Sequence, residues 1–375
     1  MVIDRPTLQD SPPSAWCLSR QEAAIILVRM AIREDTKTGY EFKTQDGTLD
    51  AEGEVPAGQG TAAKPKKKPK FIEDSKALTQ EIDPVLGTLV GGRYRIARLL
   101  GKGNMSRVYV AEQTSMQRNV AVKLLQAELV VDETAEGRFR QEVDAVSRLH
   151  SPHTIRFYDA GRTPAGVPYI VMELLAGQTL RERLDDDIVL PPLEVVSIAN
   201  QMACSLHEAH EAGVLHRDLK PENVYFCHVP TPLQPFLKLL DFGLAKLLDD
   251  RGPNDPTLTG KRQTVGTPAY MAPEMIVEER PVDHRSDIYA LGLMCFEMLT
   301  GSRPFQEENS MKMALAHVRS PVPSAKERNP SLPDGIDEFF AAAMAKNPEH
   351  RPQHVVDLAR LLGECLGDKR NGRES

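Results

Sequence analysis

Two glycines in the stretch LGKGNMSRV could form a phosphate-binding turn. Gly101 and Gly103 lack a Cβ atom, so the backbone can approach phosphate oxygens closely and offer successive N–H groups as donors. Ser106 stands where a third glycine would complete the pattern GxGxxG. Two glycines alone also fit an ordinary strand turn, so the nucleotide interpretation needs support from residues elsewhere in the chain.

A lysine and a glutamate downstream supply that support. Lys123 lies inside the apolar alternation NVAVKLL, and Glu142 lies in GRFRQEVDAVSRLH, one helical turn from the apolar Val146. A lysine in a strand is more often solvated, whereas a carboxylate beside an apolar stripe needs a cation. We therefore expect Glu142 to hold the Lys123 ammonium as a fixed positive charge facing nucleotide phosphates.

The elements that position these residues are predicted to be strands followed by one helix. Residues 94–100, 107–113 and 119–125 alternate with the period of a β-strand and predict a small antiparallel sheet. In a dinucleotide-binding fold a helix follows the glycines, whereas here RVYVAEQ continues as a strand. This context excludes the dinucleotide-binding interpretation.

Four further motifs follow in order along the chain: VLHRDLKPENVYF, LKLLDFGLAK, GTPAYMAPE and DHRSDIYALG. With VAVK upstream, they make residues 94–362 resemble the eukaryotic-type protein kinase family, serine/threonine branch, and its bacterial members most. The resemblance implies an α+β, bilobal protein kinase fold. Its small lobe would be an antiparallel β-sheet with one key helix, its hinge would lie at residues 173–177, and its large lobe would be mainly α-helical.

The resemblance implies a role for each polar residue of these motifs. Asp218 would accept the hydrogen bond of a substrate hydroxyl and orient it toward the γ-phosphorus of ATP, with Lys220 beside the transferring phosphoryl group. Lys123 would be the third catalytic residue. Asn223 and Asp241 would hold Mg²⁺, with Mn²⁺ as an alternative. The LKPEN context implies serine or threonine as the acceptor.

The nucleotide pocket follows from the same resemblance. Met172 stands where the family narrows the adenine pocket, and backbone groups of residues 173–175 would bond the adenine edge. The implied ATP-binding residues are Leu100, Gly101, Lys102, Gly103, Val108, Ala121, Lys123, Glu142, Glu173 and Leu175.

Other motif positions resemble residues that shape the site. Asp287 would anchor the backbone of the catalytic loop, and Glu274 would form a buried ion pair with Arg351. Thr267 would hydrogen-bond toward Asp218 and Lys220.

Regulation is implied by a stack of side chains and by one arginine. Val146, His216 and Phe242 would stack as the regulatory spine, although Val146 alone also fits simple core packing. Arg217 would pair with a phosphate on the activation loop. The candidate phospho-acceptors, modified by autophosphorylation, are Thr257, Thr259 and Thr264.

Composition narrows the class of protein further. The chain has 375 residues, is 41% hydrophobic and 26% charged, and carries a net charge of −7, which argues against a surface built for nucleic acid or anionic membrane. Its five cysteines are far apart and lack CxxC spacing, so a reducing compartment is expected, without disulfides or structural zinc. No stretch is long and apolar enough to predict an integral membrane segment.

Composition also divides the chain. The lysine run KPKKKPK could tether a phosphate-rich partner, although a solvated spacer is favoured. The prolines of HVPTPLQPF predict an exposed excursion between two strands. The predicted divisions are an N-terminal segment of unknown fold at 1–50, a flexible Gly/Pro/Lys-rich linker at 51–84, a protein kinase domain at 94–362 with its small lobe at 94–172 and large lobe at 178–362, and a C-terminal tail at 363–375.

The sequence therefore predicts a cytoplasmic, ATP-dependent serine/threonine protein kinase that acts on protein substrates and on itself, with no nucleic-acid partner. The chain ends soon after the last predicted helix, which suggests a soluble member of the family or a fragment of a longer protein. A pseudokinase scaffold or nucleotide-binding interaction module is the alternative, disfavoured because Lys123, Asp218, Asn223 and Asp241 are all present. A small-molecule phosphotransferase is more distant, because it would lack the peptide-docking segment GTPAYMAPE.

Overall fold

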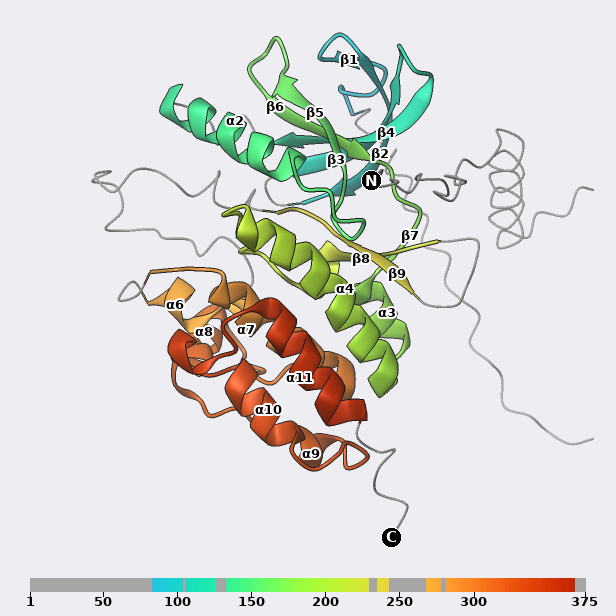
Figure 1. The fold of residues 1–375 in the computed structure, drawn as a ribbon. Coiled ribbons are helices and arrows are strands. Elements are labelled where there is room, and N and C mark those ends of the chain that lie inside the picture. Colours follow the sequence, from blue (N-terminus) through green and yellow to red (C-terminus); the bar gives the residue numbers. More distant parts are fainter. Residues whose placement is uncertain are drawn as a thin grey trace, which may run out of the picture. The chain divides into compact units, whose positions relative to one another are not determined.

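The computed structural model describes residues 83–103, 106–125, 133–228, 235–242, 268–277 and 281–367, and their side chains except those of 133–136 and 138–140. All of these residues fall within one compact unit, Leu78–Ser375. They form a β-sheet lobe that carries one helix and a lobe that is mainly helical (Figure 1).

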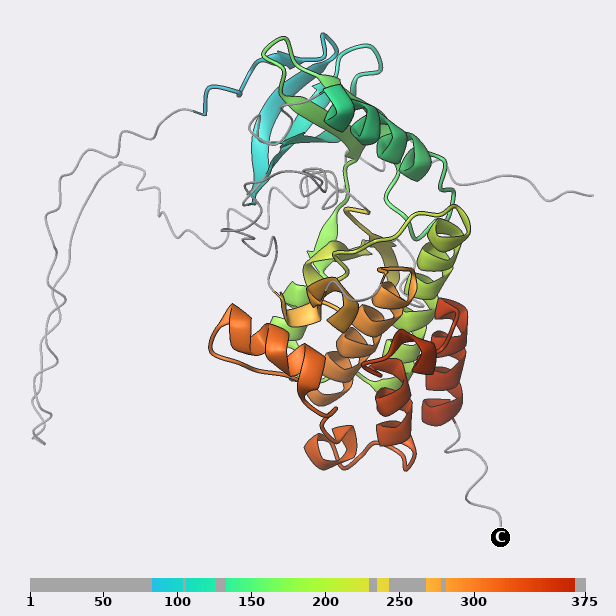
Figure 2. The ribbon, with the colours of Figure 1, turned by 90° about the vertical axis from the view of Figure 1, so that its left-hand side faces the viewer.

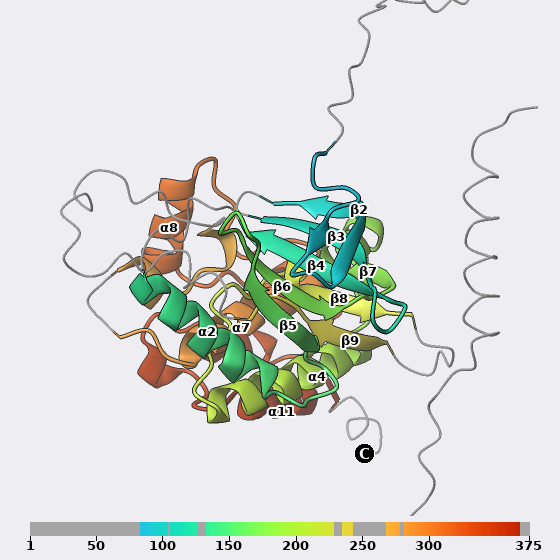
Figure 3. The same cartoon turned by 90° about the horizontal axis from the view of Figure 1, so that it is seen from above.

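Six strands form the sheet of the small lobe, in the order β1-β2-β3-β4-β6-β5 with every neighbouring pair antiparallel (Figure 3). Their bounds are β1 Leu89–Val90, β2 Tyr94–Lys102, β3 Ser106–Gln113, β4 Arg118–Leu125, β5 Phe157–Arg162 and β6 Pro168–Glu173. Helix α2, Glu133–Ser147, packs beside β5 (Figure 2). The antiparallel sheet and its one helix agree with the prediction, and β1, β5 and β6 extend it.

Alternation along β4 separates two apolar faces of this sheet. Val122 packs with Tyr109 on one face, whereas Ala121 packs with Val143 of α2 on the other. Since alternate strand residues share a face, Lys123 projects on the same side as Ala121. The apolar alternation VAVK thus brings an ammonium group to the α2 side of the sheet, where its side chain is only 10% exposed.

The described part of the small lobe includes residues from Asp83 onward, which lie ahead of the predicted domain start at residue 94. The Tyr109 hydroxyl donates to Asp83 Oδ2 at 2.8 Å, and Arg107 lies 3.5 Å from the same oxygen. Val90 of β1 is buried in the cluster that contains Tyr109. Strand β1 was not predicted from the sequence, because it has only two residues and lies between turns that contain glycine.

The large lobe combines a small sheet with helices. Strands β7 Gly177–Thr179, β8 Val224–Cys227 and β9 Phe236–Leu239 are antiparallel in that order. The helices are α3 Leu180–Asp186, α4 Pro192–Glu211, α6 Pro273–Ile276, α7 Arg285–Thr300, α8 Ser310–Arg319, α9 Ala325–Arg328, α10 Ile336–Ala343 and α11 Val355–Gly367, with 3-10 turns at Pro221–Asn223, Pro268–Tyr270 and Pro348–His350.

Helix α7 forms the centre of the large lobe. All its residues from Ser286 to Leu299 are buried, and α4 and α11 pack together next to it (Figure 1). A helix that is buried on all sides must be enclosed by neighbouring elements. Helix α11 continues to Gly367 and buries Leu366, so the folded lobe extends past the predicted boundary at 362. In the described part of the chain, no helix combines the length and apolar character needed to cross a bilayer.

The excursion predicted for HVPTPLQPF falls between β8 and β9, which form a hairpin. Residues 229–234 lie outside the described residues. The end of the excursion is fixed to α4, because Gln201 donates to the Pro235 carbonyl at 2.7 Å and accepts from the Leu237 N–H at 3.0 Å.

Candidate active site

The loop after α4 brings three predicted catalytic and metal-binding residues together. Lys220 Nζ lies 2.6 Å from Asp218 Oδ2, and Asn223 Nδ2 donates to the Asp218 carbonyl at 2.7 Å and to Oδ2 at 3.1 Å. The side chains of Asp218 and Lys220 are 34% and 29% exposed. The Asp218 carboxylate is thus held by two neighbours and remains accessible to a substrate.

Asp287, in the first turn of α7, fixes the backbone just ahead of Asp218. Its carboxylate accepts from the N–H groups of His216 and Arg217, both at 2.9 Å, and His210 Nε2 lies 2.8 Å away. Arg217 has φ 62°, a left-handed conformation that costs energy in a residue with a side chain. Burial alone raises the pKa of Asp287, but the contacts with His210 and His216 outweigh it and lower the pKa.

Lys123 of the small lobe contacts the aspartate of the DFG motif in the large lobe. Its Nζ lies 2.7 Å from Asp241 Oδ1. Desolvation raises the pKa of Asp241, but the Lys123 ammonium outweighs it and holds the pKa below its usual value. Glu142 is half-buried on α2, and its predicted pairing with Lys123 stays a prediction. A cation and a carboxylate, one from each lobe, therefore meet at this point.

The metal-binding prediction fits the donor chemistry. Because Asn223 uses its amide nitrogen toward Asp218, its Oδ1 oxygen is the atom left for a cation. An amide oxygen and the Asp241 carboxylate are hard ligands, and Mg²⁺ commonly takes one or two protein ligands together with phosphates. Among the described residues, no group of three or more His, Cys, Asp or Glu side chains could hold a metal alone.

The glycine turn connects β2 to β3. The Gly103 N–H donates to the Ser106 carbonyl at 2.8 Å, and Ser106 is the first residue of β3, past the turn. Among the described residues, a Cβ atom added at Gly101 would meet nothing within 4 Å, and one at Gly103 would come no closer than 3.6 Å to Ser106. Contacts with the described residues therefore do not require these two glycines. Leu100 and Lys102 beside them are exposed.

Several apolar residues near the predicted adenine pocket pack together in one cluster. Val108, Ala121, Met172 and Leu175 pack in one group together with Leu240, the residue before the DFG motif. These side chains come from β3, β4, β6, the hinge and the segment after β9. Both lobes therefore contribute to this apolar surface.

The hydrogen bonds of the hinge differ for two of the backbone N–H groups in the segment predicted to bind adenine, those of Glu173 and Leu175. The Glu173 N–H donates to the Arg156 carbonyl at 3.0 Å, so it is already occupied. The Leu175 N–H forms no backbone hydrogen bond with another described residue. Leu175 is accordingly the better placed donor for an adenine ring.

The predicted stack of the regulatory spine is formed in part by direct ring contact. The His216 and Phe242 rings lie 4.7 Å apart, and Phe242 and Val146 belong to the same buried cluster. Burial lowers the pKa of His216, so the neutral ring can donate from Nε2 to the Leu240 carbonyl at 2.9 Å. The segment leading to Asp241 is thereby fixed to the catalytic loop.

The predicted ion pair of the large lobe is present. Arg351 contacts both carboxylate oxygens of Glu274, at 2.6 and 2.8 Å, and the two side chains are 0% and 1% exposed. Arg351 also donates to the carbonyls of Ala345 and Arg285. The pair joins α6 to the first residue of α7 and to the segment before α11.

Sequence reasoning missed a second buried carboxylate near the peptide-docking segment. Glu297 of α7 accepts from the Tyr270 hydroxyl and pairs with Arg181 of α3 at 2.9 Å. Burial and the nearby Glu297 charge raise the pKa of Tyr270. The three residues come from separate elements, so spacing along the chain could not reveal them.

Several predicted residues lie outside the described part of the chain. Thr257, Thr259, Thr264 and Thr267 all fall within residues 243–267. Their predicted roles stay predictions.

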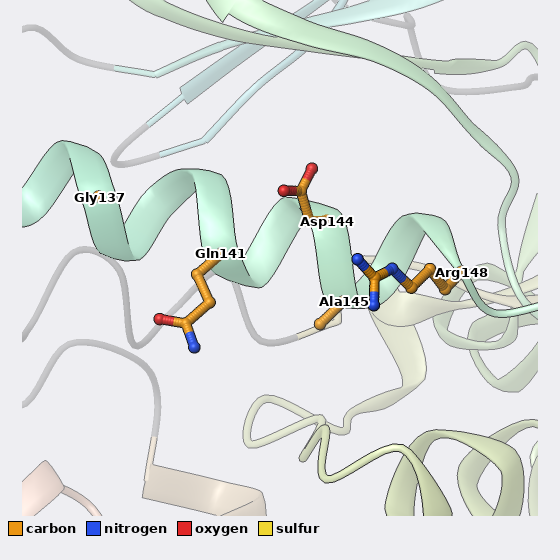
Figure 4. Close-up of a pocket in the computed structure, with 5 residues that line it drawn as sticks. All are labelled: Gly137, Gln141, Asp144, Ala145 and Arg148. Carbon is orange, nitrogen blue, oxygen red and sulfur yellow. The ribbon is translucent and has the colours of Figure 1, made fainter.

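A hollow on the exposed side of α2 is separate from this site. It is lined by Gly137, Gln141, Asp144, Ala145 and Arg148, and in Figure 4 Asp144 points away from the side to which Gln141 and Ala145 point. None of its lining residues belongs to the apolar cluster of Val108 and Leu175 or to the charged groups around Asp218 and Asp241.

Lys123 of the sheet lobe meets Asp241 of the helical lobe, and the charge of Lys220, which is bound to Asp218, also lowers the pKa of Asp241. This grouping of Lys123, Asp218, Asn223 and Asp241 between a sheet lobe and a helical lobe is the architecture of a protein kinase. Residues 94–360 match the family model for the protein kinase domain, and the chain belongs to this family. The predicted fold and family are therefore confirmed.

The curated relatives include bacterial kinases. The chain is 37% identical over 277 residues to the serine/threonine-protein kinase pkn3 of Myxococcus xanthus, covering 73% of this chain and 50% of the relative. It is 35% identical over 274 residues to the serine/threonine-protein kinase PrkC of Bacillus subtilis, covering 73% of this chain and 40% of the relative. The chain thus spans half or less of the length of these relatives.

A solved structure supports the same fold. The crystal structure of the Mycobacterium tuberculosis PknI kinase domain aligns with a TM-score of 0.58 and 27% identity. The alignment covers 74% of this chain and 97% of that one.

Proposed function

We propose that this protein is an ATP-dependent serine/threonine protein kinase. The observation that carries the proposal is the grouping of Asp218, Lys220 and Asn223 within one loop, with the charge of Lys220 also acting on the Asp241 of the Lys123–Asp241 pair. The bacterial relatives named serine/threonine-protein kinases support the choice of acceptor. The substrates are proteins that present serine or threonine hydroxyls.

Asp218 is the residue proposed to act on the acceptor hydroxyl. Its accessible carboxylate accepts the hydroxyl hydrogen, directs the oxygen at the γ-phosphorus and takes the proton late in the transfer. Lys220, already 2.6 Å from Asp218, places a positive charge beside the same position. That charge stabilises the negative charge that develops on the transferring phosphoryl oxygens.

Asn223, Asp241 and Lys123 are proposed to hold the phosphate side of ATP. Mg²⁺, or Mn²⁺ in its place, would neutralise phosphate charge when held by Asn223 and Asp241. Lys123 contributes the fixed ammonium, and Gly101 and Gly103 let backbone N–H groups approach the phosphates. The adenine ring would lie against the apolar cluster and accept from the Leu175 N–H.

The test is transfer of labelled phosphate from Mg-ATP to a generic basic protein and to the kinase itself. Asp218→Asn and Lys123→Met serve as matched controls, because each removes one proposed function without removing bulk. We expect incorporation into serine and threonine by the wild type and loss of nearly all of it in both variants. Equal incorporation by wild type and Asp218→Asn would overturn the role of Asp218 and favour a contaminating kinase.

Autophosphorylation of the activation loop is part of the proposal. Arg217 precedes Asp218 and is held by Asp287, and its cationic side chain suits a phosphate on Thr257, Thr259 or Thr264. Mass spectrometry of protein incubated with Mg-ATP is expected to find phosphate in residues 250–266. Absence of phosphate there would refute this part alone.

We also propose a cytoplasmic location, where ATP is supplied. Cys204, Cys227, Cys295 and Cys365 are free thiols, which is consistent with a reducing compartment. This location is tested by fractionating cells that express the full chain and comparing its distribution with that of marker proteins from the membrane and from a disulfide-forming compartment.

A further inference from the structure

An ion pair lies beside the proposed nucleotide cleft and has no part in the chemistry described above. Lys238 Nζ of β9 lies 2.8 Å from Glu173 Oε1, at the end of β6. The two side chains are only 14% and 20% exposed. Partial burial strengthens such a pair relative to one on the open surface, because water screens it less.

Each partner also binds a third segment, the stretch between α2 and β5. The Arg156 N–H donates to Glu173 Oε1 at 2.7 Å, and Lys238 Nζ donates to the Thr154 carbonyl at 3.2 Å. The backbone of Glu173 donates to Arg156 as well. One charge pair therefore joins the last small-lobe strand, the stretch after α2 and the large-lobe strand β9.

Both ends of this pair lead directly to groups that would contact ATP. Glu173 is two residues before Leu175, the proposed adenine donor, and Lys238 is two residues before Leu240, which packs in the same apolar cluster as Leu175. Asp241 follows Leu240. The pair therefore links the hinge to β9 next to the residues that would contact the adenine ring.

We infer that Lys238 is a positioning residue for nucleotide binding: its ion pair with Glu173 holds the hinge so that Leu175 and the apolar cluster receive the adenine ring. This inference rests on the proposed kinase function. It predicts an effect on ATP affinity, because neither side chain reaches Asp218 or Lys220.

The test compares ATP kinetics and direct nucleotide binding in four proteins: wild type, Lys238→Met, Glu173→Gln and the double variant. Lys238→Met is expected to raise the KM for ATP and the Kd for Mg-ADP about fivefold while kcat stays within about twofold, a size typical of a coupled partly buried contact. The double variant should be little worse than either single variant, since both remove one interaction. Lys238→Arg, which keeps the charge, should restore most of the affinity.

Controls separate this positioning role from general stabilisation and from failure of the proposed function. Lys312→Met removes the lysine of an exposed pair with Glu308 and is expected to leave the KM for ATP unchanged. A lowered melting temperature in Lys238→Met with unchanged KM and Kd would overturn the inference and leave a structural ion pair only. A wild type that binds no Mg-ADP would instead overturn the proposed function.

Discussion

At the residue scale, the site places each charged group within reach of an opposite charge or a donor. Lys123 of the small lobe meets Asp241 of the large lobe, while Lys220 and Asn223 hold Asp218 within one loop. The residue types and spacing predicted this grouping, since DxKxxN and DFG are short motifs that each fix their own members. The pairing of Lys123 with Asp241 was not predicted, because it joins residues far apart in sequence.

The serine in the glycine turn gives a prediction at this scale. Ser106 is the first residue of β3. Its side chain is uncharged, so the charge of the proposed phosphate site does not depend on it. Ser106→Gly is expected to change the KM for ATP by less than about threefold, since it removes one uncharged hydroxyl and increases backbone freedom. Steady-state kinetics at varied ATP check this, and a change of several orders of magnitude in kcat would show that Ser106 contacts the reacting phosphate.

At the element scale, two buried carboxylates connect the catalytic loop and the docking segment to other elements of the large lobe. Asp287 of α7 holds the loop, and Glu274 of α6 binds Arg351. Both were predicted from motif positions, whereas the contacts of Glu173 with Lys238 and of Glu297 with Arg181 were not. A motif identifies residues at a fixed spacing that the chemistry of the site requires. Contacts between separate elements depend instead on how those elements pack.

Asp287→Asn tests the anchoring of the loop. An amide at this position can accept fewer of the three donors and turns an N–H₂ group toward one of them. We expect kcat to fall by about tenfold to a hundredfold, with a smaller change in the KM for ATP, because Asp218 loses its fixed position. An unchanged kcat in a folded variant would contradict the anchoring role.

Arg351→Met tests the buried pair of the large lobe. Removing the arginine leaves the Glu274 charge buried without its partner, which typically costs about 3–5 kcal/mol. Chemical denaturation should therefore show a large loss in the free energy of unfolding. The variant Arg360→Met, which removes an exposed pair with Glu364, is the control and should change stability by less than about 1 kcal/mol.

At the scale of the whole molecule, the sequence predicted the fold class because the motifs are specific and the strands alternate clearly. Strand β1 and the end of α11 lie outside the predicted bounds of 94–362, because β1 is only two residues long and α11 continues to Gly367.

Packing within the large lobe also affects how stability responds to pH. His317 is buried, lies 3.0 Å from the Tyr289 hydroxyl and is near the cation of Lys346.

Burial and the positive charge of Lys346 lower the pKa of His317 to about 4 from its usual 6.5. The folded state therefore binds this proton less well than the unfolded chain. The stability due to neutral His317 is complete above pH 6.5 and is lost as pH falls toward 4, by on the order of 3 kcal/mol. In His317→Asn, the free energy of unfolding should fall less over this range, and a curve parallel to the wild type would contradict the assignment.

The central claim is that Asp218 directs phosphate from ATP to a protein hydroxyl. The most direct measurement is single-turnover transfer of labelled phosphate by the wild type and by Asp218→Asn, with Mg-ADP binding measured on the same samples. The account predicts a rate lower by roughly 10² to 10⁴-fold in Asp218→Asn, with nucleotide affinity within about threefold of the wild type. Equal transfer rates in two proteins that bind Mg-ADP equally would contradict it.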